Sequence, residues 1–220
     1  MWRLLVVIAF ALLDTVSAWT ACPYTGYGLI NGGGSCTPCP YGYYSYDATC
    51  CDVYGRNVKF CSACPAGQYQ DNQAQTGCKS CPGGQYQGPG GGWSYCKSCP
   101  GGQSCGGGCT TCNACGAGYY ASGGWSSCQI CPAGQYQNYG SQSSCYGCPA
   151  GQYQGSQGQH GCNTCGSGHA SGGSSSSCYQ CNQGHYSGSG QGSCTQCPPG
   201  QYQDNTVNSA CRHCVPGQYQ

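Results

Sequence analysis

Cysteine pairs of the form Cys-x-x-Cys recur along most of this chain at a nearly constant interval. Ten pairs begin between Cys61 and Cys211, and the first cysteines of successive pairs are 16, 17 or 18 residues apart. Six of the second cysteines begin the same heptad, Cys-x-x-Gly-Gln-Tyr-Gln. A regular period of this kind indicates one short structural unit copied many times.

The composition excludes a conventional hydrophobic core. After residue 18, the 220-residue chain contains only eight Leu, Ile, Val, Phe or Met residues: Leu29, Ile30, Val53, Val58, Phe60, Ile130, Val207 and Val215. Burying an aliphatic side chain contributes about 1.5–3 kcal/mol, whereas ordering one residue costs about 1–2 kcal/mol. The 27 cysteines must therefore supply the missing stability as covalent links.

Each unit has the pattern of a small two-armed loop. Pro after the second Cys and Gly three residues after it predict a turn. Gln-Tyr-Gln alternates polar and aromatic residues and predicts a short strand, and an arm rich in Gly, Ser and Asn leads back to the next Cys. We expect the Tyr ring to cover the disulfide and neighbouring units to touch little.

The spacing also suggests a disulfide connectivity, if each opening Cys (the second of a pair) bonds to the first Cys of the next pair. The predicted bonds are Cys64–Cys78, Cys81–Cys96, Cys99–Cys112, Cys115–Cys128, Cys131–Cys145, Cys148–Cys162, Cys165–Cys178, Cys181–Cys194 and Cys197–Cys211, with Cys22–Cys36, Cys39–Cys50, Cys51–Cys61 and Cys105–Cys109 in the less regular segments. Cys214 is left unpaired. Because the chain stops at Gln220 before a closing Cys, we expect the sequence to be part of a longer protein.

The N-terminus predicts the compartment. Arg3, the apolar run at 4–13 and Val16-Ser17-Ala18 are typical of a secretory signal peptide over residues 1–18. No later stretch is long and apolar enough to span a membrane. We expect an irregular cysteine-rich module at 19–60 and tandem repeats at 61–220, the last incomplete. The predicted fold is a small disulfide-rich repeat protein, an elongated rod of short β-hairpin-like loops with little regular secondary structure.

The residue composition argues against metal binding, acid–base catalysis and nucleic-acid binding. Repeated Cys-x-x-Cys is also a zinc pattern, but the signal peptide and the single-file period favour disulfides. Four Asp and no Glu after residue 18 leave little material for acid–base catalysis or calcium binding. The four histidines, His160, His169, His185 and His213, occupy polar positions of the unit. We expect no catalytic, cofactor or metal site, and a net charge of +1 is too small for nucleic-acid binding.

Trp93 and Trp125 are the candidate binding aromatics. Both precede a closing Cys in Gly-Gly-Trp-Ser segments. They suggest stacking on a sugar ring, or, as the favoured interpretation, a ring that covers a disulfide.

The Cys-x-x-Cys-Pro-x-Gly-x-Tyr units at 61–220 resemble the ephrin-receptor-type cysteine-rich repeats of the growth-factor-receptor cysteine-rich superfamily, and more distantly the first submodule of tumour necrosis factor receptor repeats. The resemblance implies an extracellular, disulfide-linked modular rod and agrees with the loop connectivity above. Cys115-Gly116, Cys165-Gly166 and Cys181-Asn182 depart from the pattern because they lack the Pro.

The sequence therefore predicts a secreted or cell-surface structural repeat protein without catalytic activity. The alternatives are a ligand-binding ectodomain fragment of a receptor or adhesion protein, which is surface-anchored if the chain continues beyond residue 220, and a carbohydrate-binding module. The expected partner is an extracellular protein or glycan, and the near-neutral surface also permits self-association.

Overall fold

The computed structural model describes residues 25–29, 36–51, 57–205, 207–215 and 217, with backbone only at 47–51 and 57–58. The predicted signal peptide (1–18) and Cys22 lie outside these residues. Every regular element assigned within them is a β-strand, and most strands contain two residues. None of the described elements is a helix suited to crossing a membrane.

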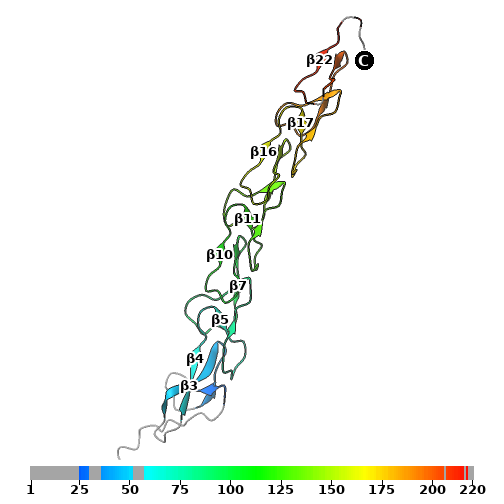
Figure 1. The fold of residues 1–220 in the computed structure, drawn as a ribbon. Coiled ribbons are helices and arrows are strands. Elements are labelled where there is room, and N and C mark those ends of the chain that lie inside the picture. The colour runs from blue at the N-terminus through cyan, green and yellow to red at the C-terminus, as the bar shows by residue number, and fades with distance from the viewer. Residues whose placement is uncertain (1–24, 30–35, 52–56, 206, 216, 218–220) are drawn as a thin grey trace, which may run out of the picture. The chain divides into compact units, whose positions relative to one another are not determined.

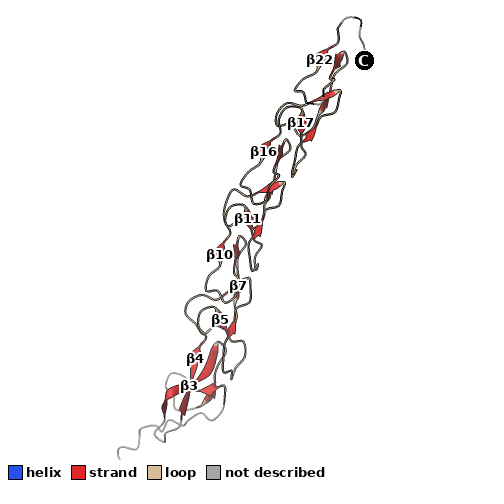
Figure 2. Ribbon diagram, in the orientation of Figure 1, coloured by secondary structure: helices blue, strands red, loops and turns tan. Residues whose placement is uncertain are grey.

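The strands form two-stranded sheets (Figure 2). Their bounds are β1 Tyr27–Gly28, β2 Thr37–Pro38, β3 Tyr43–Cys51, β4 Asn57–Ala63, β5 Gln68–Tyr69, β6 Lys79–Ser80, β7 Gln85–Tyr86, β8 Lys97–Ser98, β9 Gln103–Ser104, β10 Asn113–Ala114, β11 Tyr119–Tyr120, β12 Gln129–Ile130, β13 Gln135–Tyr136, β14 Tyr146–Gly147, β15 Gln152–Tyr153, β16 Asn163–Thr164, β17 His169–Ala170, β18 Tyr179–Gln180, β19 His185–Tyr186, β20 Thr195–Gln196, β21 Gln201–Tyr202 and β22 Arg212–His213. The predicted small disulfide-rich repeat fold of short hairpins is confirmed.

The chain divides into two compact units. The first unit comprises Met1–Lys97 with Gly107–Thr111, and the second comprises Ser98–Gly106 with Cys112–Gln220. Figure 1 shows the hairpins of the second unit, coloured from green to red, following one another in single file. The second unit is therefore a tandem array in which each repeat has a neighbour before and after it.

Buried cysteines take the place of a hydrophobic core. Nine opening cysteines are only 0–2% exposed: Cys39, Cys64, Cys81, Cys99, Cys115, Cys131, Cys148, Cys165 and Cys181. In the described part of the chain, Leu29 is the one larger aliphatic side chain that is fully buried, and Tyr27, Cys36 and Phe60 pack against it. The cystines thus supply most of the buried apolar volume.

Nine disulfides join an opening Cys to the first Cys of the next pair, as the spacing leads one to expect. They are Cys64–Cys78, Cys81–Cys96, Cys99–Cys112, Cys115–Cys128, Cys131–Cys145, Cys148–Cys162, Cys165–Cys178, Cys181–Cys194 and Cys197–Cys211. Cys36, Cys105 and Cys109 are also disulfide-bonded. The predicted partner of Cys36, Cys22, lies outside the described residues, and Cys105–Cys109 stays a prediction.

The predicted bonds Cys39–Cys50 and Cys51–Cys61 are wrong, because the structure joins Cys39 to Cys61. In the β3–β4 hairpin Cys51 lies opposite Asn57, four residues along β4 from Cys61. At about 3.3 Å per residue that separation is about 13 Å, well beyond the ~7 Å between Cα atoms that a disulfide can bridge. Cys39 therefore follows the same rule as the later opening cysteines, and the Cys50-Cys51 segment is an insertion within its loop.

Candidate functional site: the turn, the buried residue and the aromatic face of each repeat

In the repeats from Cys64 to Cys197, the four residues that follow the opening Cys form a type II turn. In the repeat that begins at Cys131, the amide of Gln135 donates to the carbonyl of Pro132 at 3.1 Å. Gly134, the third residue of the turn, has φ of 81°, which is the conformation that a type II turn requires at that place. The turn directs β13 back toward the following Cys-x-x-Cys pair.

Main-chain hydrogen bonds interlock successive repeats within each unit. From the Cys131 repeat, the amide of Gly134 donates to Gln154 O at 2.7 Å and that of Gln137 to Gln159 O at 3.0 Å, both in the next repeat. In the other direction, the amide of Gly158 donates to Cys131 O at 2.9 Å. The equivalent three bonds recur from the Cys115 and Cys148 repeats. The expectation that neighbouring repeats touch little is therefore wrong.

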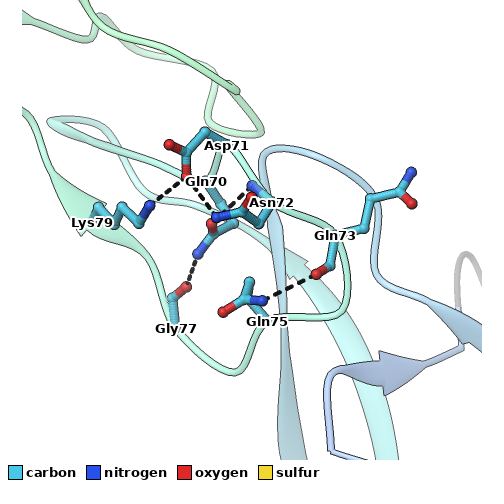
Figure 3. Close-up of polar contacts among 7 residues, drawn as sticks. All are labelled: Gln70, Asp71, Asn72, Gln73, Gln75, Gly77 and Lys79. Carbon is cyan, nitrogen blue, oxygen red and sulfur yellow. Dashed lines mark hydrogen bonds and ion pairs between the residues drawn. The ribbon is translucent and has the colours of Figure 1, made fainter.

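The residue at the third position of Gln-Tyr-Gln, or of the segment that replaces it, is buried in every repeat from Cys64 to Cys197. These residues are 0–7% exposed: Gln70, Gln87, Cys105, Ala121, Gln137, Gln154, Ser171, Ser187 and Gln203. A buried amide is stable only when both its ends are hydrogen-bonded. Figure 3 shows how Gln70 meets this requirement, since its Nε2 donates to the carbonyl of Gly77 while its Oε1 accepts the amide of Asn72.

Each of the five buried glutamines holds the arm that leads back to the closing Cys, and it does so at the same position of the repeat. The side chain donates to the carbonyl of the residue just before the closing Cys, at distances of 2.5–2.8 Å, and its oxygen accepts a main-chain amide one or two residues on. The acceptor carbonyls belong to Gly77, Tyr95, Ser144, Gly161 and Ala210.

The identity of this buried residue correlates with the length of the disulfide-closed loop in which it lies. Loops with Gln join cysteines separated by 14 or 15 positions, whereas loops with Cys, Ala or Ser join cysteines separated by 13. The longer arm leaves main-chain groups that the Gln amide satisfies, because it can donate and accept at once. The composition of the heptad did not indicate this role, but the correlation between Gln and loop length is visible in the sequence.

In the repeats from Cys64 onward, where the first strand ends in Tyr, that side chain is half-buried and lies at the surface of its hairpin. Tyr120 packs against Trp125 with ring centroids 5.5 Å apart, and Tyr136 lies 6.0 Å from Tyr146. In the first unit, the ammonium group of Lys79 lies 6.0 Å from the Tyr69 ring. These rings, rather than charged groups, form the main chemical feature of the surface.

The two candidate tryptophans each contact a side chain of their own repeat. Trp125 packs on Tyr120, and the Lys97 ammonium lies 5.4 Å from the Trp93 ring centroid. Both tryptophans are partly buried, and the Trp93 Nε1 atom is buried without a hydrogen-bond partner. Each tryptophan ring therefore packs within its own repeat.

The ionisable groups are dispersed over the described residues. Asp71 and Lys79 form an exposed ion pair, drawn in Figure 3. The hydrogen bond from Lys79 lowers the pKa of the Asp71 carboxyl, and the same bond raises the pKa of Lys79. Among the described residues, no three His, Cys, Asp or Glu side chains lie together in a way that could hold a metal ion. His169 and His185 are half-exposed, and each Nδ1 lies 3.2–3.3 Å from the carbonyl oxygen two residues earlier.

Cys214 carries a free thiol and stands at an opening position. Its amide donates to Gly200 O at 3.0 Å, as the amide of Cys148 does to Gly134 O at 2.9 Å. The Cys214 amide is thus bonded in the same way as the amide of an earlier opening cysteine.

A family model described as tyrosine-protein kinase ephrin type A/B receptor-like matches residues 52–95, 118–151 and 184–220. These three segments together cover more than half of the chain. The chain belongs to this ephrin-receptor-like family. A comparison with curated proteins found no match. Ephrin-receptor-like repeats are ectodomain modules rather than catalytic domains, and their disulfides fit an extracellular location.

Proposed function

We propose that this chain serves as an extracellular spacer, a non-catalytic segment of a secreted or surface-displayed protein that sets the distance between the elements at its ends. The interlocking of successive repeats carries the proposal. In the second unit, the Cys115, Cys131 and Cys148 repeats each make the same main-chain bonds with the repeat that follows. Repeats that share such bonds are coupled to their nearest neighbours and form a one-dimensional array, so they do not move independently.

The bonding pattern favours a spacer because it does not depend on side-chain identity. The donors and acceptors are main-chain groups of Gly134, Gln137 and Cys131 and of their equivalents in other repeats. The array can therefore gain or lose repeats without losing its connection between neighbours. The dilute charge also suits this role, since the chain has 6 Lys or Arg and 5 Asp.

The test is to remove a whole repeat from the second unit. Deleting residues 131–147 joins Ile130 to Cys148 and preserves a Cys-x-x-Cys pair, while duplicating them adds one repeat. Fluorescent labels introduced by non-canonical amino acids at exposed Ser126 and Asp204 report the separation across the array. The proposal predicts equal and opposite changes in the mean separation. A separation that does not follow repeat number refutes it.

The family match favours a second candidate function, a ligand-binding segment of a receptor ectodomain, whose partner is an extracellular protein or glycan. The two candidate functions predict different results when one repeat is replaced by another. A spacer tolerates exchange of residues 131–147 for a second copy of 148–164, which has the same length, whereas a binding segment loses function when its contact repeat is replaced.

A further inference from the structure

One hairpin of the second unit carries two tyrosines directly opposite each other. Tyr136 on β13 and Tyr146 on β14 are direct cross-strand partners. Their ring centroids are 6.0 Å apart with an interplanar angle of 46°. Tyr146 is 49% exposed, and Tyr136 is half-buried. Both rings are therefore close to one another and open to small solutes.

The pairing is particular to this repeat among the cross-strand registers described for the repeats. The partners of the equivalent tyrosines are polar: Lys79 for Tyr69, Gln129 for Tyr120, Asn163 for Tyr153, Thr195 for Tyr186 and Arg212 for Tyr202. Tyr179 occupies the same place as Tyr146, directly after a closing Cys, and is 50% exposed, but it lies opposite Ala170. The chain thus provides a matched internal comparison.

We propose that Tyr136 and Tyr146 form a site of oxidative cross-linking, at which an extracellular peroxide and a haem peroxidase convert the pair to dityrosine. Each phenol gives up one electron and one proton, so two tyrosyl radicals form. The radicals couple through the ring carbons ortho to the oxygens, and the proton on each of those carbons then moves to the neighbouring oxygen, which restores the aromatic ring and the phenol. Hydrogen peroxide accepts two electrons and two protons in all and leaves as two molecules of water.

The surroundings of the pair favour coupling over quenching. Thiols quench tyrosyl radicals, but the cysteines whose side chains are described, apart from Cys214, are locked in disulfides. The strands β13 and β14 contain two residues each, and the Cys131–Cys145 disulfide already holds the two arms together. The two rings therefore stay near each other for the lifetime of a radical, and the new C–C bond would add a second covalent link across the hairpin.

The experiment treats the full chain, at high dilution, with hydrogen peroxide and a haem peroxidase. Dityrosine fluorescence and mass spectrometry of digested peptides are then recorded. The proposal predicts a cross-linked product that has lost two hydrogens and joins Tyr136 to Tyr146, with a yield per chain that does not change on further dilution. A principal intramolecular cross-link through other tyrosines, such as the more exposed Tyr139, overturns it.

Two phenylalanine variants complete the test, because Phe keeps the ring and its packing but has no phenol to oxidise. Y146F is expected to abolish this cross-link, whereas Y179F, at the equivalent and equally exposed position, is expected to leave its yield unchanged. Equal losses in both variants, or no loss in Y146F, contradict the proposal. Recovery of the Cys131–Cys145 peptide from each variant under non-reducing conditions verifies that the hairpin is intact.

Discussion

Replacing Gln137 by Ala removes the brace from one long loop while leaving its disulfide in place. The Gln137 side chain donates to Ser144 O at 2.7 Å, and its Oε1 accepts the Tyr139 amide at 3.2 Å. Gln137 is fully buried. The substitution therefore leaves a main-chain carbonyl and a main-chain amide without their partners in the repeat.

The expected cost follows from those two bonds. Each contributes about 1 kcal/mol net, and leaving the main-chain partner groups poorly satisfied raises the total to about 2–4 kcal/mol. Because about 1.4 kcal/mol corresponds to a factor of ten, hydrogen-exchange protection of the Tyr139 amide should fall by a factor of about 30 to 700. The Cys131–Cys145 bridge keeps the loop closed, so the loss should be confined to this repeat and its neighbours.

Hydrogen exchange measured by NMR gives the protection of the Tyr139 amide directly. The matched control is Gln135→Ala, which removes the other Gln of the same motif, a half-buried side chain, and should change protection by less than about threefold. Deleting Asn138 from the Gln137→Ala chain produces the arm length of the Ala121 repeat and should restore part of the protection. Protection in Gln137→Ala equal to that in Gln135→Ala would refute the bracing role.

Two further predictions concern the turn and the ion pair. Gly118→Ala should lower the free energy of unfolding by more than about 1–2 kcal/mol, because φ of Gly118 is 79° and the new Cβ would collide with the Gly158 carbonyl. Gly116→Ala is the control, because a Cβ at Gly116 meets no atom within 4 Å. A similar loss of thermal stability in both variants would contradict this prediction. Because the pKa of Asp71 is lowered, the ion pair is fully formed above the ordinary carboxyl pKa and is lost as the pH falls through the lowered pKa. Because the pKa of Lys79 is raised, the ion pair persists at high pH until the pH rises through the raised pKa of Lys79. Lys79→Ala should thus raise the Asp71 titration midpoint in NMR, and an unchanged midpoint would show that Lys79 is not the cause.

The disulfide connectivity of the repeats could be predicted from the sequence because each bond is local and the pattern is periodic. Cys131 and Cys145 are joined by one short loop, and the intervals between cysteines carry that information directly. The turn at Gly134 could be predicted for the same reason, since Pro-x-Gly has a known conformational preference.

The contacts between repeats could not be predicted in this way. The bond from Gly134 N to Gln154 O joins main-chain groups, so almost any residue can make it and no residue type marks it. The Cys39–Cys61 bond was missed because the nearer Cys50 and Cys51 offered shorter loops, whereas the β3–β4 register places Cys51 far from Cys61. The burial of Gln137 was missed because Gln is usually solvated.

Peptide mapping of the oxidised protein under non-reducing conditions tests most directly the claim that each opening Cys bonds to the first Cys of the next pair. The structure predicts peptides that join Cys39 to Cys61 and Cys131 to Cys145. Recovery of Cys39 bound to Cys50, or of Cys131 bound to any cysteine other than Cys145, would contradict the account.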